Sequence, residues 1–207
     1  MSDLASGAPR VNTQVARPTG WKGMLKPYVV AVLSAFWVRW YKLRLSNHVQ
    51  FGRNFATNGR MVIRGPGRVI FGDDINAWAN AEKNVFITYT AESRITVGSG
   101  SRLNGVGAMA YTQISFGPRC IVGSAIVVDN DFHPLEPAKR HDPTAPITAA
   151  PIKIGENVWL AGQCAVLKGV TVGDNSVVGF RAVVSGNVPA NVVVAGNPAR
   201  IVKRFDT

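Results

Sequence analysis

The most regular feature of the sequence is an aliphatic residue that recurs every six positions near the C-terminal end. A period of six matches neither the 3.6-residue turn of an α-helix nor a heptad, and glycine and β-branched residues, which are common here, disfavour helices. Gly, Asn and Asp often stand where turns would fall. The pattern therefore predicts short strands joined by tight turns. The recurring residues are Ile154, Leu160, Val166, Val172, Val178 and Val184.

Six residues are enough for one short strand and one turn, and three such units close a triangular coil. Residues three repeats apart then stack on one wall, about 4.8 Å from each other. We expect an all-β fold, a left-handed parallel β-helix of hexapeptide repeats. Connections between parallel strands are usually right-handed, so a left-handed coil is an exception. We expect it here because of the hexapeptide signature. The predicted stacked pairs are Ile154 with Val172, Leu160 with Val178, and Val166 with Val184.

The same frame continues upstream, so the chain divides into unequal parts. Phe116, Val122 and Val128 fall in the frame, and looser matches reach back to Phe51. We predict a flexible N-terminus over 1–20, an amphipathic helix over 21–48, the β-helix domain over 49–197 with a loop over 129–151, and a C-terminal segment over 198–207.

The frame breaks between Val128 and Ile154, where 26 residues replace the expected six. Loops that leave a rigid scaffold often carry catalytic residues. His133 and Asp131 lie near the start of this loop, and a histidine with an ordinary pKa of about 6.5 suits a general base. A structural role in binding loop backbone is the alternative for His133. We expect His141, later in the loop, to be a solvated residue, and His48 to be structural.

Motifs for several other chemistries are absent from the sequence. It has no GxSxG nucleophile elbow, phosphate loop or dinucleotide fingerprint. Cys164 occupies a repeat position that should pack inside the coil, and Cys120 is the only other cysteine, which favours a reducing compartment. The three histidines lack the spacing of a zinc site, so we expect no metal. These absences fit a reaction with a preactivated donor such as a thioester.

An N-terminal helix over 25–45 is predicted from an apolar stripe at helical spacing. The stripe consists of Val29, Leu33, Phe36, Trp40 and Leu43. The uninterrupted apolar part, 28–38, is about half as long as a bilayer span. Two roles remain open for this helix: it could cap the exposed end of the solenoid, or its aromatic and basic residues could lie at a membrane interface.

Charge is concentrated at the same end of the chain. The net charge of the 207 residues is +11, and residues 1–68 contain eleven Lys or Arg against one acid, Asp3. Such a segment suits an anionic membrane, a phospholipid-linked substrate or nucleic acid, or it is a solvated basic tail. No nucleic-acid recognition fold is evident, so we expect no nucleic acid partner. Residues 1–20 do not resemble a secretory signal, so we expect a cytoplasmic protein with peripheral contact at the inner membrane face.

Residues 152–205, together with the DNDFHPL segment of the loop, resemble the hexapeptide-repeat acetyltransferases. This family contains maltose and galactoside acetyltransferases and bacterial polysaccharide O-acetyltransferases, and the similarity covers roughly 49–205. The resemblance implies acetyl-CoA as donor and direct transfer to a sugar hydroxyl of a surface polysaccharide or lipid-linked glycan. It also implies a homotrimer with active sites between subunits.

The resemblance also implies roles for individual residues. His133 matches the loop base, Asn104 matches an acceptor-binding asparagine, and Trp159 matches a tryptophan near the CoA groove. Tyr111 stands where galactoside-type enzymes have an acceptor-orienting aspartate, which disfavours a free mono- or disaccharide. Residues expected along the pantetheine arm are Ala161, Gly162, Gly179, Phe180 and Ser185, and those expected at the nucleotide phosphates are Arg200 and Lys203.

Other positions depart from the family pattern. Phe180 and Arg181 replace a small Ala-Gly pair, and Gly186 replaces a lysine, so details of donor binding differ. Two alternative functions remain open at this point. One is N-acetylation of a nucleotide-linked amino sugar on the same coil, and the other is a non-catalytic β-helix scaffold.

Overall fold

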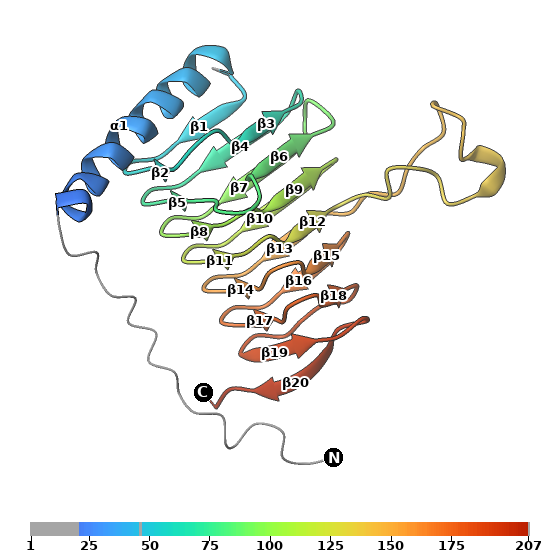
Figure 1. Ribbon diagram of the computed structural model, residues 1–207. Helices are drawn as coiled ribbons and strands as arrows, with labels where there is room; N and C mark the ends of the chain where they lie inside the picture. The colour runs from blue at the N-terminus through green and yellow to red at the C-terminus, as the bar shows by residue number, and fades with distance from the viewer. Residues whose placement is uncertain (1–20, 46, 207) are drawn as a thin grey trace.

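The computed structural model describes residues 21–45 and 47–206, and side chains from residue 28 onward. The predicted flexible segment 1–20 lies outside the described residues. The chain winds through three parallel sheets in turn and confirms the left-handed β-helix, with helix α1 (Trp21–Arg44) at one end (Figure 1). We call the sheets A, B and C, and the edges between them the AB, BC and CA corners.

The strands of each sheet stack in chain order. Sheet A contains β1 (Val49–Phe51), β4 (Arg68–Phe71), β7 (Arg94–Val97), β10 (Gln113–Phe116), β13 (Ile152–Ile154) and β16 (Thr171–Val172). Sheet B contains β2 (Ala56–Thr57), β5 (Asn76–Ala77), β8 (Arg102–Leu103), β11 (Ile121–Val122), β14 (Trp159–Leu160), β17 (Val177–Val178), β19 (Val192–Ala195) and the antiparallel β20 (Arg200–Arg204). Sheet C contains β3 (Val62–Arg64), β6 (Val85–Thr88), β9 (Gly107–Ala110), β12 (Ile126–Val128), β15 (Ala165–Leu167) and β18 (Val183–Val184).

The predicted stacking is confirmed in the last coils. Ile154 pairs with Val172, Leu160 with Val178, and Val166 with Val184. All six side chains are at most 1% exposed. Because β-branched side chains pack well on a pleated wall, the repeat builds a continuous core along the axis. The stiff hexapeptide frame is therefore the scaffold that positions everything outside it.

One frame position was predicted wrongly. Val127, and not Val128, pairs with Val166 and is fully buried, while Val128 pairs with Leu167 on the outer side. The reason is the turn before β12, which has three residues (123–125), whereas the equivalent turn one coil later has four (161–164). The shorter turn shifts the strand by one residue, which exchanges its inner and outer faces.

Asparagines stabilise the turns of the AB corner. Asn157, Asn175 and Asn191 have φ of 54°, 58° and 59°, in the left-handed region that Asn tolerates better than most residues. Their side-chain amides form a ladder, with Nδ2 to Oδ1 distances of 2.9 and 3.0 Å. The same residues thus satisfy an unusual backbone geometry and join successive coils.

Helix α1 packs against β1 and β2 at the first coil. The Ser34 hydroxyl accepts a hydrogen bond from the Thr57 N–H at 2.9 Å, and the Tyr41 hydroxyl donates to the Met61 carbonyl at 2.7 Å. Both side chains are buried. The helix therefore covers the strand edge that the first coil would otherwise expose, as a cap does.

The buried face of α1 is not the predicted apolar stripe. Of the five stripe residues, Val29, Leu33, Phe36 and Leu43 are exposed, and only Trp40 is half-buried against the core. The helix is apolar on both faces, so spacing could not identify which face the solenoid takes. Among the described helices, none is long and apolar enough to span a bilayer.

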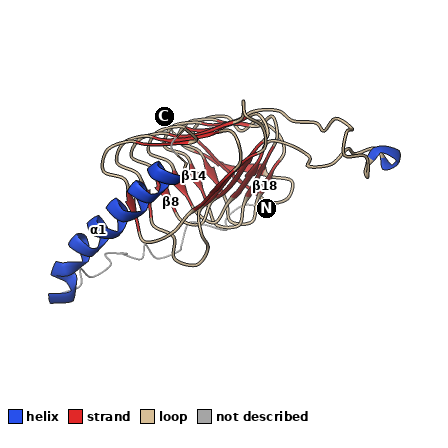
Figure 2. Cartoon of the chain, turned by 90° about the horizontal axis from the view of Figure 1, so that it is seen from above, coloured by secondary structure: helices blue, strands red, loops and turns tan. Residues whose placement is uncertain are grey.

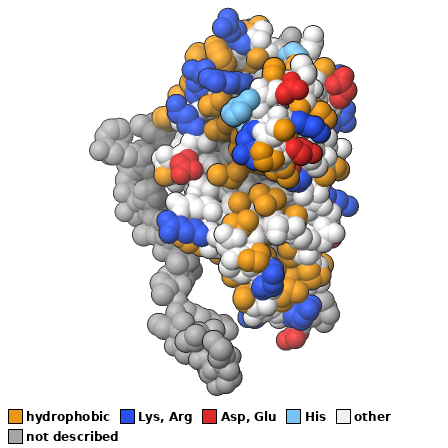
Figure 3. All heavy atoms as spheres, turned by 90° about the vertical axis from the view of Figure 1, so that its right-hand side faces the viewer, with side chains coloured by type: hydrophobic (Ala, Val, Ile, Leu, Met, Phe, Trp, Pro, Cys, Tyr) orange, Lys and Arg blue, Asp and Glu red, His pale blue; other side chains and the backbone are white. Residues whose placement is uncertain are grey.

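The loop between β12 and β13 leaves the CA corner and projects away from the coils (Figures 1 and 2). It contains a single 3₁₀ turn, Pro137–Lys139, and most of its side chains are exposed. Acidic, basic and histidine side chains gather over the upper half of the face from which it projects (Figure 3).

Candidate active site

The loop is anchored at its root by a buried carboxylate. Asp129 is fully buried and accepts hydrogen bonds from the backbone N–H groups of Tyr111 and Thr112 at 2.6 and 2.7 Å. The Thr112 hydroxyl donates to the same carboxylate at 2.8 Å. The Asn130 side-chain amide donates to it as well, at 3.2 Å. These four donors compensate the desolvation of the carboxylate, so the loop leaves the coil at a fixed point.

Asp131 forms an ion pair with Lys168, on the next coil. The distance from Lys168 Nζ to Asp131 Oδ1 is 2.5 Å, and the two side chains are 30% and 15% exposed. The second carboxylate oxygen, Oδ2, is buried and has no hydrogen-bond partner among the described residues. Sequence reasoning missed Lys168, because the residue is far from the loop in the chain and comes next to it only through the coil.

A backbone hydrogen bond holds His133 in place, whereas its side chain is exposed to solvent. Its N–H donates to the Asp131 carbonyl at 2.7 Å. The preceding Phe132 has φ of 60°, donates its N–H to Asn130 Oδ1 at 2.9 Å, and packs edge-on against Tyr89 with ring centroids 5.8 Å apart. This tight turn presents the imidazole of His133 to solvent beside the coil, where an acceptor hydroxyl could reach it. His141, further along the loop, is also exposed.

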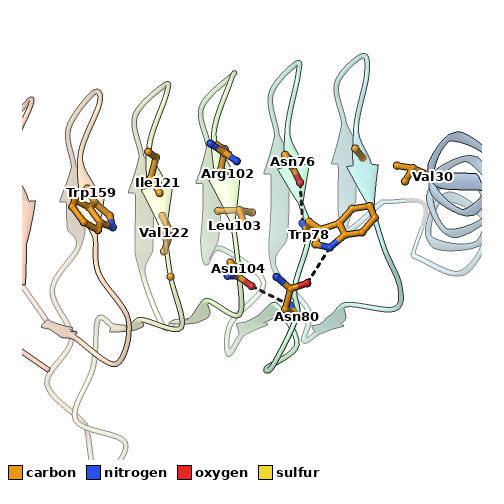
Figure 4. A pocket seen from close by; sticks show the side chains of 12 residues that line it. Val30, Asn76, Trp78, Asn80, Arg102, Leu103, Asn104, Ile121, Val122 and Trp159 are labelled. Carbon is orange, nitrogen blue, oxygen red and sulfur yellow. Dashed lines mark hydrogen bonds between the residues drawn. The ribbon is translucent and has the colours of Figure 1, made fainter. Parts of the chain in front are cut away.

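A second feature is a groove of about 690 Å³ on the outer face of sheet B. It runs from α1 to Trp159, and Figure 4 shows its lining side chains in one row across successive coils. Asn104, the predicted acceptor residue, lies in this groove at the BC corner, and Trp159 is 50% exposed at its far end. The two residues are thus brought to one surface.

Four of the eight predicted donor-binding residues lie at the BC corner. Ala161 and Gly162 form its turn in one coil, and Gly179 and Phe180 form it in the next. A Cβ on Gly162 would lie 3.5 Å from the Phe180 ring, which is 62% exposed and stacks with Arg181 at 5.2 Å. Glycine therefore leaves a narrow path beside an exposed aromatic ring.

The remaining donor-binding residues are further away. Ser185 follows β18 and so belongs to the CA corner, away from Gly162 and Gly179. It shares a small pocket of about 300 Å³ with Arg200 at the C-terminal end of the solenoid. Lys203 lies on β20, paired with Val193. The structure thus gathers four of the predicted pantetheine residues and separates the fifth from them.

Within one chain, the two halves of the predicted site are on different corners. Asn104 precedes β9 and Tyr111 follows it, so the width of sheet C separates them. Tyr111, Asp131 and His133 belong to the CA corner, whereas Asn104 belongs with the groove. A single chain does not bring the predicted base to the predicted acceptor residue.

The two cysteines are inside the coil, which was expected for Cys164 from its repeat position. Both are fully buried, and burial raises the pKa of Cys120 to about 11 and that of Cys164 to about 12. The Cys120 thiol also donates to the Gly155 carbonyl at 3.2 Å. A thiol is nucleophilic as the thiolate, so neither cysteine is suited to covalent catalysis. No cluster of three or more metal-ligating side chains occurs in the described part of the chain.

Comparison with protein families identifies the repeat. Residues 151–186 match the model of the bacterial transferase hexapeptide (six repeats). This stretch begins just before β13 and ends after β18, and it contains the strict six-residue frame.

Individual proteins are similar over longer stretches. The galactoside O-acetyltransferase of Escherichia coli (strain K12) is 30% identical over 131 residues, 63% of this chain and 62% of the relative. This chain therefore spans less than two thirds of that relative's length. Another protein of the same strain, named as a predicted O-acetyl transferase of lipopolysaccharide biosynthesis, is 25% identical over 177 residues, 79% of this chain and 88% of the relative.

A solved structure shares the fold. The hexapeptide-repeat-containing acetyltransferase of Vibrio cholerae O1 biovar eltor, in complex with acetyl coenzyme A, superimposes with a TM-score of 0.57 at 20% sequence identity. The superposition covers 89% of this chain and 85% of that chain. At this identity the similarity concerns the fold.

Proposed function

We propose that the chain is a hexapeptide-repeat acetyltransferase, as its family match and its relatives suggest, and that it transfers an acetyl group from acetyl-CoA to a hydroxyl of a surface polysaccharide or lipid-linked glycan. The observation that carries this proposal is His133, exposed on a loop that Asp129 anchors to a rigid coil. The acceptor class follows from the relatives, one named for galactoside and one for lipopolysaccharide.

His133 acts as general base in a direct transfer. Its neutral imidazole takes the proton of the acceptor hydroxyl while the hydroxyl oxygen attacks the thioester carbon, and the CoA thiolate then leaves and takes up a proton. The thioester supplies the activation, so no covalent enzyme intermediate is needed. This agrees with the burial of both cysteines.

Asp131 is a positioning residue in this mechanism. Its carboxylate is engaged by Lys168, and its backbone carbonyl holds the His133 N–H. The ion pair ties the start of the loop to the next coil and restricts the imidazole to one region. Tyr111 helps to fix the start of the loop at the CA corner, because its backbone N–H donates to the carboxylate of Asp129.

The BC corner suits the donor. The glycine at Gly162 leaves room for a thin pantetheine arm, Gly179 lies in the turn of the next coil, and the exposed rings of Trp159 and Phe180 offer apolar contact. Ala161 lies in the same turn. Arg200 and Lys203 supply positive charge for the nucleotide phosphates, and Ser185 lies beside Arg200.

A homotrimer would complete the site. His133 and Asn104 are on different corners of one chain, and the loop that carries His133 projects away from its own coil (Figure 1). In a closed ring of three copies, each loop reaches the groove of a neighbour. Each active site then combines the base of one subunit with the acceptor residue of another.

We also propose that the enzyme acts in the cytoplasm, with α1 at the inner face of the membrane. Exposed apolar residues on α1, among them Val32 and Phe36, lie beside the basic Arg39, Lys42 and Arg44. This combination suits an interface with anionic lipids, where a lipid-linked glycan would be found.

Acceptor profiling tests the proposed reaction. The full chain is incubated with acetyl-CoA and a panel of polysaccharides, neutral sugars and nucleotide-linked amino sugars, and the products are identified by NMR. We expect new O-acetyl signals on a glycan and release of one CoA per acetyl group. Acetylation of amino groups alone would indicate the N-acetyltransferase alternative, and no acetyl-CoA consumption with any acceptor would indicate a scaffold.

A further inference from the structure

A pocket of about 280 Å³ lies where the C-terminal end of α1 meets the first coil, and we call it the arginine pocket. It shares no lining residue with the groove on sheet B, and the proposed reaction does not use it. Three of its lining residues are arginines: Arg44 from the last turn of α1, Arg60 from the turn before β3, and Arg64 from the end of β3. Figure 1 shows this end of α1 beside the first coils.

The arginine pocket contains no acid that balances its charge. No Asp or Glu is among its lining residues. Within residues 28–45 and 47–206, whose side chains are described, none of the three guanidiniums forms an ion pair. Glu82 lines a neighbouring pocket that Arg60 also borders, but Lys83 beside it offsets its charge. Because like charges repel, three arginines around one pocket favour the binding of an anion.

Two of the guanidiniums are placed by one aromatic ring. The guanidinium carbon of Arg44 lies 5.9 Å from the centroid of the Trp40 ring, and that of Arg60 lies 5.7 Å from it. Trp40 is half-buried and packs edge-on against the buried Tyr41, with ring centroids 5.1 Å apart. The core therefore holds the ring that both arginines contact, and less side-chain freedom is lost when the arginines bind a ligand.

A structural role explains only one of the three arginines. Arg44 is in the last turn of α1, where the helix dipole favours a positive charge. Arg60 and Arg64 belong to the coil, so this preference does not explain their positions.

The chemistry of the pocket suits a compact group with more than one negative charge. A guanidinium presents parallel N–H donors that match the oxygens of a phosphate group. The volume lies just below the range of most small-molecule sites, roughly 300–1,000 Å³, so a phosphate or diphosphate fits better than a glycan chain. Leu43, next to Arg44, is apolar and 74% exposed. Exposed apolar side chains beside basic ones are typical of surfaces that meet lipid headgroups.

We propose that the arginine pocket binds the phosphate or diphosphate group of a lipid. The lipid as source of the phosphate rests on the proposed contact of α1 with the membrane, whereas the chemistry of the pocket does not depend on acetyl transfer. The phosphate enters between the arginines while Leu43 contacts the apolar part of the lipid. The pocket thus adds recognition of one headgroup to the general attraction between basic residues and an anionic membrane.

Calorimetry with inorganic pyrophosphate tests the chemistry of the pocket without a membrane and without catalysis. The full chain is compared with Arg60→Gln, because Arg60 is exposed and, unlike Arg44, is not part of a helix end. We expect Arg60→Gln to bind at least about tenfold more weakly, since a charge-assisted hydrogen bond is lost. Pyrophosphate bound elsewhere, as at Arg200 and Lys203, would not respond to this substitution.

Arg94→Gln is the matched control, because Arg94 is also an exposed arginine and lies on β7, two coils further along. It should bind pyrophosphate like the wild-type protein. Equal affinity of the wild type and Arg60→Gln, an equal loss in Arg94→Gln, or no binding by the wild type would overturn the proposal.

Flotation distinguishes a lipid phosphate from a free one. Phosphatidylcholine vesicles contain either phosphatidic acid, a phosphate monoester, or phosphatidylglycerol, a diester, and the two kinds are matched in surface potential. We expect the wild type and Arg94→Gln to favour the phosphatidic acid vesicles, and Arg60→Gln to bind both kinds equally. Equal flotation of the wild type with both would overturn the assignment to a lipid, and pyrophosphate binding through Arg60 would then identify a free phosphate compound as the ligand.

Acetylation assays separate the arginine pocket from the proposed reaction. If a glycan is O-acetylated but Arg60→Gln binds pyrophosphate and vesicles like the wild type, the pocket proposal fails and the reaction stands. If both kinds of binding require Arg60 but no acetyl group is transferred, the reaction fails and the pocket proposal stands.

Discussion

At the scale of single residues, two acids of the loop have different tasks. Asp129 is fully buried and satisfied by three donors from the 111–112 turn, so it fixes where the loop begins. Asp131 is only partly buried and forms an ion pair with Lys168. The first interaction is part of the fold, and the second orients the turn that carries His133.

The position of His133 could be predicted from the sequence, because it follows directly from the break in a strict repeat. The role of Lys168 could not be predicted in the same way. Lys168 meets Asp131 across 37 residues, and this contact depends on the exact height at which the loop rejoins the coil. The hexapeptide frame gives the stacking of inward residues, but it does not give the rotamers of outward ones.

The buried thiols predict how stability depends on pH. An unfolded thiol ionises near pH 8.5, whereas burial raises the pKa of Cys120 to about 11 and that of Cys164 to about 12. The contribution to stability is therefore complete below about pH 8.5 and is lost as the pH rises through the folded pKa values. Each thiol lowers the free energy of unfolding by up to about 1.4 kcal/mol per pH unit within that window.

Urea unfolding of the wild-type protein and Cys164→Ala, at about pH 7 and about pH 10, measures this effect. The variant has a lower stability at neutral pH because it leaves a small cavity, but it should lose less stability on going to alkaline pH. An equal loss of unfolding free energy between about pH 7 and about pH 10 in the two proteins would show that the Cys164 thiol does not contribute to the pH dependence of stability.

At the scale of elements, helix α1 shows where a pattern is informative and where it is not. The helix itself was predictable from the apolar spacing and the absence of internal glycine after residue 23. Its buried face was not, because Ser34 and Tyr41, which contact the first coil, are no more hydrophobic than the exposed Val32 and Phe36. Hydrogen bonds to the open strand edge decide the orientation, and these have no signature in hydrophobic spacing.

The exposed face of α1 predicts binding to anionic vesicles. Phe36 is 58% exposed, and inserting such a side chain into the interface contributes roughly 1.5–3 kcal/mol, about tenfold or more in binding. In flotation with and without anionic lipid, we expect the full chain to float with anionic vesicles and Phe36→Asp to remain largely in the soluble fraction.

Val202→Asp serves as control in this experiment, because Val202 is an equally exposed apolar residue on β20, at the opposite end of the solenoid. This variant should float like the wild type. Recovery of the wild-type protein in the soluble fraction under both lipid conditions would refute membrane contact.

At the scale of the whole molecule, the regular coil separates chemical roles by corner. The CA corner carries His133, the proposed base, whereas sheet B carries the groove and the BC corner carries most of the residues proposed for the pantetheine arm. The sequence could predict the coil and the residues on it, because stacking every three repeats is a local rule. It could not predict that His133 and Asn104 lie on different corners of one chain, because the upstream coils repeat less strictly and their turns differ in length, as in 78–84 and 104–106.

The most direct test of the account is the rate of acetyl transfer from acetyl-CoA to the glycan acceptor by His133→Ala, alone and after subunit exchange with Asn104→Ala. Loss of a general base costs about 10²–10⁴-fold in rate. We expect His133→Ala to lose at least about 10²-fold while it still binds CoA. The mixture should regain a measurable part of the wild-type rate, because some sites then combine an intact base with an intact groove. A His133→Ala rate close to that of the wild type, or a mixture as slow as its components, would contradict the account.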